Sequence, residues 1–171
     1  MNIRSHARLG LAAVLAASAL AIPASQALAD AEPVVGVADA EALFHSKDPK
    51  LDRNKQAAYH IEKELLECGE WDRAGEWLTK AYHQHNPQAN SGLDGVVYFF
   101  TQVLKVKAKP CPAKMTNKVV AVIAEGDYVT VLTPRVLKDP KDPSKTYSTS
   151  WFDTWRFVGG KADEHWDPAT K

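Results

Sequence analysis

Apolar positions recur at intervals of three and four residues along the middle of the chain, as they do on one face of an amphipathic helix. The first such stripe is formed by Ala58, Ile61, Leu65 and Cys68, and Gly69 ends it. A second, shorter stripe begins after Gly69 and predicts a helix that ends near Ala81. A third stripe between residues 96 and 104 completes a set of three predicted helices.

After Pro112 the apolar period changes to two, and β-branched and aromatic residues become frequent. This pattern predicts four strands, separated by Gly-containing turns or a Pro-containing connection, over residues 119–124, 128–137, 146–158 and 161–166. Helices followed by consecutive strands are typical of an α+β fold. We therefore expect three N-terminal helices packed on one face of an antiparallel sheet.

The N-terminal region has the pattern of an export signal. Arg4 and Arg8 precede an apolar stretch over residues 9–22, and the small-residue site Ala27-Leu28-Ala29 follows. Cleavage after Ala29 would leave residues 30–51 as a partly ordered leader and residues 52–171 as one domain. Because the apolar stretch is shorter than the roughly 20 residues of a membrane span, we expect a soluble periplasmic or secreted protein without a membrane partner after cleavage.

The charge balance argues against a nucleic-acid partner. The chain holds 21 basic and 21 acidic residues, and cleavage would remove two basic ones and no acids. The mature protein would then carry a formal charge of about −2 and no basic run.

The only two cysteines, Cys68 and Cys111, have two interpretations. In an oxidising compartment they can form a disulfide, which the chain-entropy model values at roughly 4 kcal/mol for a loop of this length. Two buried free thiols are the alternative, since cysteine is among the most buried residue types.

Several segments, taken in order, resemble those of one known family. They are the run from Tyr82 to Pro87, a Gly-containing step into the third helix, and the residues 123–127, 151–157 and 159–167. This ordered set resembles the SnoaL-like branch of the nuclear transport factor 2-like superfamily. The resemblance implies a cone-shaped fold in which a strongly curved sheet encloses a pocket. It also implies a possible homodimer through the exposed sheet face.

Members of this superfamily include polyketide cyclases, ketosteroid isomerase-like enzymes and carbon–carbon lyases, besides proteins that only bind or dimerise. Close relatives often carry His residues in the strand that here reads Val129 to Arg135, where this chain has none. The resemblance therefore implies an activity of this general kind and leaves a non-catalytic protein as an alternative.

Asp153 is the first candidate for catalysis. Alternation along its predicted strand places it on the same face as Trp151, Trp155 and Phe157. A carboxylate among aromatic side chains suits general acid or base chemistry. The alternative is a structural carboxylate that pairs with an Arg or with a Trp N–H.

Two His residues are candidates to assist Asp153. His165 lies on the neighbouring predicted strand and would form an acid–base pair with Asp153 if the register matches. Alternation brings either His165 or Trp166 to the inner face, and the sequence leaves this open. The family resemblance implies that His85 lies at the pocket mouth, although it could instead serve the turn before Pro87.

The substrate-binding candidates share an aromatic or amide side chain and are Tyr82, Asn86, Phe100, Trp151, Trp155 and Trp166. Each aromatic residue alone could equally be part of the core. As a set they favour a small hydrophobic ligand, aromatic or polycyclic, as the partner.

These observations predict an exported enzyme that performs aldol, retro-aldol, isomerase or lyase chemistry by acid–base catalysis without a cofactor, using Asp153, His85 and His165. The alternative is a ligand-binding or dimerising accessory protein with the same pocket. A metal site built from His83, His85, His165 and Asp153 has a weak spacing, so we predict none.

Overall fold

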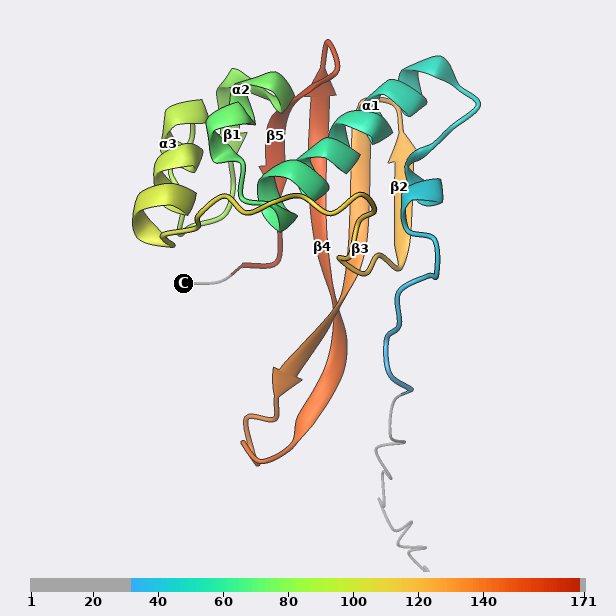
Figure 1. Ribbon diagram of the computed structural model, residues 1–171, viewed down its shortest axis with the longest axis vertical. Coiled ribbons are helices and arrows are strands. Elements are labelled where there is room, and N and C mark those ends of the chain that lie inside the picture. Colours follow the sequence, from blue (N-terminus) through green and yellow to red (C-terminus); the bar gives the residue numbers. More distant parts are fainter. Residues whose placement is uncertain (1–31, 170–171) are drawn as a thin grey trace, which may run out of the picture. The chain divides into compact units, whose positions relative to one another are not determined.

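The computed structural model describes residues 32–169, and the predicted signal sequence lies outside this range. Within it, helices cover one face of a five-stranded sheet (Figure 1). No helix in residues 32–169 is long and apolar enough to cross a membrane.

Helix α1 spans Pro49–His60 and continues as a π-helical segment over Ile61–Glu67. The helix begins at Pro49 because the Asp48 carboxylate accepts hydrogen bonds from the backbone N–H groups of Lys50 and Leu51. The first predicted helix is thus present, with an earlier start than its apolar stripe indicates. Figure 1 shows α1 lying across the face of the sheet.

The second predicted helix is mostly wrong. A 3₁₀ turn over Trp71–Arg73 leads into α2, which covers only Ala74–Trp77, and the chain then forms strand β1 over Leu78–Gln84. Backbone groups at the edge of the sheet offer β1 a hydrogen-bonding partner, and this tertiary pairing overrides the short helical pattern. Helix α3 follows at Leu93–Tyr98 and ends in a second π-helical segment, Phe99–Val103.

The four predicted C-terminal strands form an antiparallel meander. They are β2, Ala121–Glu125; β3, Tyr128–Lys138; β4, Thr146–Val158; and β5, Lys161–Trp166. Strand β1 pairs in parallel with β5, which gives the order β1-β5-β4-β3-β2. The sheet is therefore mixed, and the expectation of a wholly antiparallel sheet is corrected by β1.

Strands β3 and β4 continue beyond the rest of the sheet as a two-stranded ribbon (Figure 1). Pairing with β2 ends at Leu132, whereas β3 and β4 stay in register through Pro134, which lies opposite Ser150. Proline is tolerated there because that edge of β3 has lost its β2 neighbour. The ribbon carries Trp151 and Arg135 to one side of the cavity described below.

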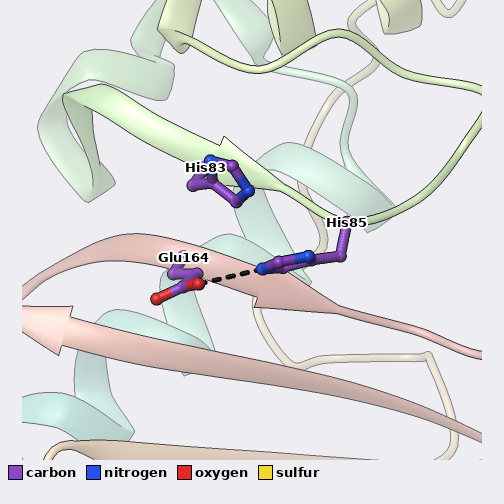
Figure 2. Close-up of side chains that lie close together, drawn as sticks. All are labelled: His83, His85 and Glu164. Carbon is purple, nitrogen blue, oxygen red and sulfur yellow. Dashed lines mark hydrogen bonds and ion pairs between the residues drawn. The ribbon is translucent and has the colours of Figure 1, made fainter.

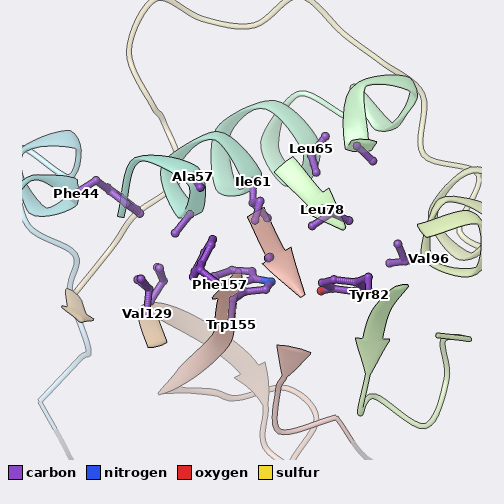
Figure 3. Packing of buried hydrophobic residues seen from close by; sticks show 14 of the residues in the cluster. Phe44, Ala57, Ile61, Leu65, Leu78, Tyr82, Val96, Val129, Trp155 and Phe157 are labelled. Carbon is purple, nitrogen blue, oxygen red and sulfur yellow. The ribbon is translucent and has the colours of Figure 1, made fainter. Parts of the chain in front are cut away.

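The hydrophobic core lies between the helices and the inner face of the sheet (Figure 3). Trp155 from β4 and Leu65 from the first π-helical segment are buried in it. Phe44, in a 3₁₀ turn over Glu41–Phe44, is fully buried against the same core. The packed domain therefore begins before residue 52, and residues 40–51 are part of it.

A disulfide joins Cys68 to Cys111 with a Cα–Cα distance of 5.2 Å, so the first of the two interpretations holds. It fastens the end of the first π-helical segment to the long connection between the helices and β2. The bridge spans a sequence separation of 43 residues. Closing a loop of this length restricts the unfolded chain substantially.

Replacing both cysteines by serine should lower the free energy of unfolding by about 2–4 kcal/mol, because the unfolded chain regains the entropy of an open loop. Urea unfolding of the oxidised protein and of Cys68→Ser/Cys111→Ser measures this difference. A reductant should destabilise the natural sequence and leave the double variant unchanged. Equal unfolding midpoints for the bridged protein and the double variant would show that the bridge contributes nothing.

Candidate active site

A cavity of about 700 Å³ lies between the π-helical segments and the β3–β4 ribbon. A smaller cavity of about 70 Å³ shares several of its walls and extends toward the core. The residues common to both are Leu66, Asn86, Phe99, Phe100, Asp153 and Asp167. Asp153 therefore lies where the wide cavity meets its narrow inner part.

Asp153 and His165 form a hydrogen-bonded pair at this junction. His165 Nε2 lies 3.0 Å from Asp153 Oδ1, and the two side chains are 7% and 15% exposed. The register places His165 opposite Trp155, so Asp153 reaches it along the diagonal of the β4–β5 ladder. The structure thus brings the two sequence candidates together and shows that His165, rather than Trp166, faces inward.

Gln84 determines which nitrogen of His165 carries a proton. Gln84 Oε1 accepts the backbone N–H of Asn86 at 2.9 Å, and since a backbone N–H can only donate, this atom is the amide oxygen. The same oxygen lies 2.9 Å from His165 Nδ1, which must therefore donate to it. With a proton on Nδ1 alone, Nε2 would be a hydrogen-bond acceptor, and an ionised carboxylate is an acceptor as well. The contact between His165 Nε2 and Asp153 therefore requires one further proton, on the ring or on the carboxylate.

An aromatic frame holds this pair. The His165 ring packs against Trp155 and Tyr82, with ring centroids 5.3 and 6.4 Å apart. Trp155 donates a hydrogen bond to the Tyr82 hydroxyl. Burial raises the pKa of Tyr82, and the nearby carboxylates of Asp153 and Asp167 raise it further. Tyr82 therefore remains a neutral phenol and lines the inner cavity.

Glu62 is a cavity residue that the sequence reasoning missed. It is 3% exposed and lines the wide cavity, and its Oε1 has no hydrogen-bond partner among residues 32–169. Burial raises the pKa of Glu62 to about 8, and the charges of Asp153 and Glu67 add to the effect. At neutral pH this side chain is therefore mainly a carboxylic acid, which can donate a proton or a hydrogen bond.

Glu62 lies in the first π-helical segment, on the side of the helix that faces the core. Both Glu62 and Glu67 are buried in this segment, whereas the predicted Ala58–Cys68 stripe includes only apolar positions. One signal was present in the sequence, because Glu62 falls four residues after Ala58 and next to Ile61 on the buried side of the helix.

Asp167 extends the site toward the C-terminal end. Its Oδ2 accepts a hydrogen bond from the Asn86 side-chain amide at 2.9 Å. Ligand atoms of Asp153, His165 and Asp167 all lie within 4.8 Å of one another, so these residues could hold a metal ion. A metal would have to displace the proton between His165 and Asp153.

Two predicted site residues, His85 and Trp166, lie elsewhere. The segment that contains His85 continues the alternation of strand β1, so Tyr82 and Gln84 face inward and His85 faces outward. Its ring stacks on Trp166 with a centroid distance of 4.9 Å. Figure 2 shows its hydrogen bond to Glu164. Neither His85 nor Trp166 lines either cavity. The predictions of a catalytic His85 and a substrate-binding Trp166 are corrected accordingly.

The remaining predicted binding residues do line the cavities, and they are Tyr82, Asn86, Phe100, Trp151 and Trp155. The wide cavity also has cationic residues that the sequence did not single out. Arg135 places its guanidinium 3.9 Å from the ring centroid of Trp151, and Lys118 lies on the same cavity wall. The cavity thus combines aromatic walls, cations in its wide part and acids at its inner part.

A curved mixed sheet, helices on one face and a cavity between them define the nuclear transport factor 2-like α+β fold. The α+β fold expected from the sequence is present, and a solved structure with a TM-score of 0.51 to this chain shares it.

No family model matches the chain, and no curated protein matches it. A proposed SnoaL-like polyketide cyclase from Jannaschia sp. CCS1 is 16% identical with a TM-score of 0.51, covering 72% of this chain and 91% of that chain. A nuclear transport factor 2-like protein of unknown function from Burkholderia pseudomallei K96243 is 18% identical with a TM-score of 0.49, covering 69% and 91%. At these identities the likeness concerns the fold alone.

The buried Glu62 should make stability depend on pH. Its pKa in the folded protein, about 8, exceeds the ordinary value of 4.5, so the folded state holds the proton more tightly. The contribution of Glu62 to the free energy of unfolding therefore falls, by roughly a few kcal/mol, as the pH rises from 4.5 to about 8. Glu62→Gln, which cannot ionise, should gain stability relative to the natural sequence from pH 5 to pH 8.

Urea unfolding of both proteins at several pH values in this range tests the expectation. The comparison cancels the titration of all other groups, since the two proteins differ at one side chain. A difference in unfolding free energy that stays constant from pH 5 to pH 8 would mean that Glu62 titrates normally.

Proposed function

We propose that this protein is an exported enzyme that performs cofactor-independent acid–base chemistry, of the aldol, retro-aldol, isomerase or lyase type, on a hydrophobic aromatic or polycyclic substrate. The observation that carries the proposal is the hydrogen-bonded pair of His165 and Asp153, which lines the cavity together with a second acid, Glu62. A pocket with apolar walls alone would have favoured simple binding.

The three groups suit proton transfer next to a carbonyl. The Asp153–His165 pair takes a proton from the carbon beside the carbonyl, and the electron pair of that C–H bond moves to the carbonyl oxygen. The neutral Glu62 carboxyl donates a hydrogen bond to this oxygen and stabilises the enolate. The enolate carbon then either attacks a second carbonyl or regains a proton elsewhere, which distinguishes an aldol reaction from an isomerisation.

The wide cavity supports a substrate with two unlike ends. Phe99, Phe100 and Trp151 offer flat apolar contacts, while Arg135 and Lys118 offer positive charge. A fused or substituted aromatic body with one anionic or strongly polar oxygen group matches this lining. The reacting carbonyl would point to the inner end, toward Asp153.

Asp153→Asn should reduce kcat/KM by roughly a hundredfold or more on any substrate the protein turns over, because the pair loses its base. The test is to incubate the purified protein with a panel of aromatic and polycyclic hydroxy-ketones and keto-acids and to follow products by mass spectrometry. His85→Ala is the matched control and should retain full activity, since His85 faces away from the cavity. Circular dichroism verifies the folding of each variant.

Full activity in Asp153→Asn would remove this carboxylate from the mechanism. Quenching of Trp fluorescence by panel compounds, without turnover in either protein, would favour the ligand-binding alternative. Activity that a chelator abolishes would contradict the prediction of cofactor-independent chemistry.

A further inference from the structure

A second cluster of ionisable side chains lies outside both cavities and consists of His83, His85 and Glu164, which Figure 2 shows. His83 and His85 are two residues apart and project to the same side of their segment, and Glu164 comes from the adjacent strand β5. His85 Nε2 lies 2.9 Å from Glu164 Oε1, and the two His rings have centroids 4.5 Å apart. One ligand atom from each residue lies within 4.8 Å of the others.

We infer that His83, His85 and Glu164 form a binding site for a divalent transition-metal ion of the zinc or copper type. Two imidazoles and one carboxylate are the ligand set that such ions accept, and zinc bound by three protein ligands keeps a further position for water. The cluster is open to solvent, with His85 39% exposed, so an ion can reach it.

The surroundings of Glu164 support this inference. Arg156 Nε donates to Glu164 Oε2 at 2.9 Å, which fixes the carboxylate and leaves Oε1 directed at the two imidazoles. Ligating carboxylates are commonly held by such outer hydrogen bonds. The Arg156 guanidinium also pairs with Asp163 at 2.6 Å, and this second carboxylate offsets its positive charge near the ion.

The outer cluster and the cavity use alternate side chains of the segment formed by strand β1 and His85. Gln84 lies between His83 and His85 and faces the opposite way, toward His165. The inference does not depend on the proposed enzymatic activity, because it concerns other side chains.

Titration of the untagged protein with Zn²⁺ by calorimetry tests the site. One ion should bind per chain, and His83→Ala and His85→Ala should each weaken the affinity at least tenfold. His45→Ala removes an exposed His outside the cluster and should leave the affinity unchanged. Asp153→Asn should also leave it unchanged, which separates this cluster from the acids of the cavity. Thermal unfolding without metal verifies that the variants fold.

Binding of Cu²⁺ can be followed independently by Trp fluorescence, because the His85 ring stacks on Trp166 with a centroid distance of 4.9 Å. Cu²⁺ should quench part of the Trp fluorescence, and Trp166→Phe should lose that part while retaining binding. The inference is overturned if the double variant His83→Ala/His85→Ala binds Zn²⁺ as tightly as the natural sequence, or if His45→Ala weakens binding as much as His83→Ala.

Discussion

Strand β1 adds in parallel to the edge of β5, and the register of this pairing decides which side chains meet on each face of the sheet. The backbone N–H of His85 donates to the His165 carbonyl at 3.1 Å, and Gln84 lies beside His165 in the ladder. Because side chains alternate along a strand, this places Gln84 against the imidazole inside and the imidazoles of β1 outside. A shift by one residue would exchange the two sets.

The cavity side of this arrangement carries a cost in stability. Glu62 is buried without a partner for its Oε1 in the described part of the chain, and burial raises its pKa to about 8. An unpaired buried acid is unfavourable for folding, whereas an apolar side chain there would pack without penalty. Strongly perturbed carboxyls that face a cavity are characteristic of functional sites, which is consistent with an acid–base role.

Sequence periodicity predicted the antiparallel meander well, because strands β2 to β5 combine clear alternation with Gly- or Pro-containing connections. It also identified Asp153 and His165 as a candidate pair on neighbouring strands, but alternation alone left open whether His165 or Trp166 faces inward. Strand β1 was missed because the short apolar stripe after Gly69 also fits a helix, and only the β5 edge decides between them. Glu62 was missed because the search for a helical stripe considered only apolar residues, and Glu62 is a charged residue type on the buried side of that stripe.

Gln84 fixes the tautomer of His165 and leaves one proton between that ring and Asp153. Nitrogen-15 NMR of the imidazole in ¹⁵N-His-labelled protein near neutral pH tests it most directly. Nδ1 of His165 should be protonated, a second proton should be coupled to Nε2 or shared with Asp153, and Gln84→Leu should alter the Nδ1 signal. A neutral ring with a bare Nδ1 would contradict the account.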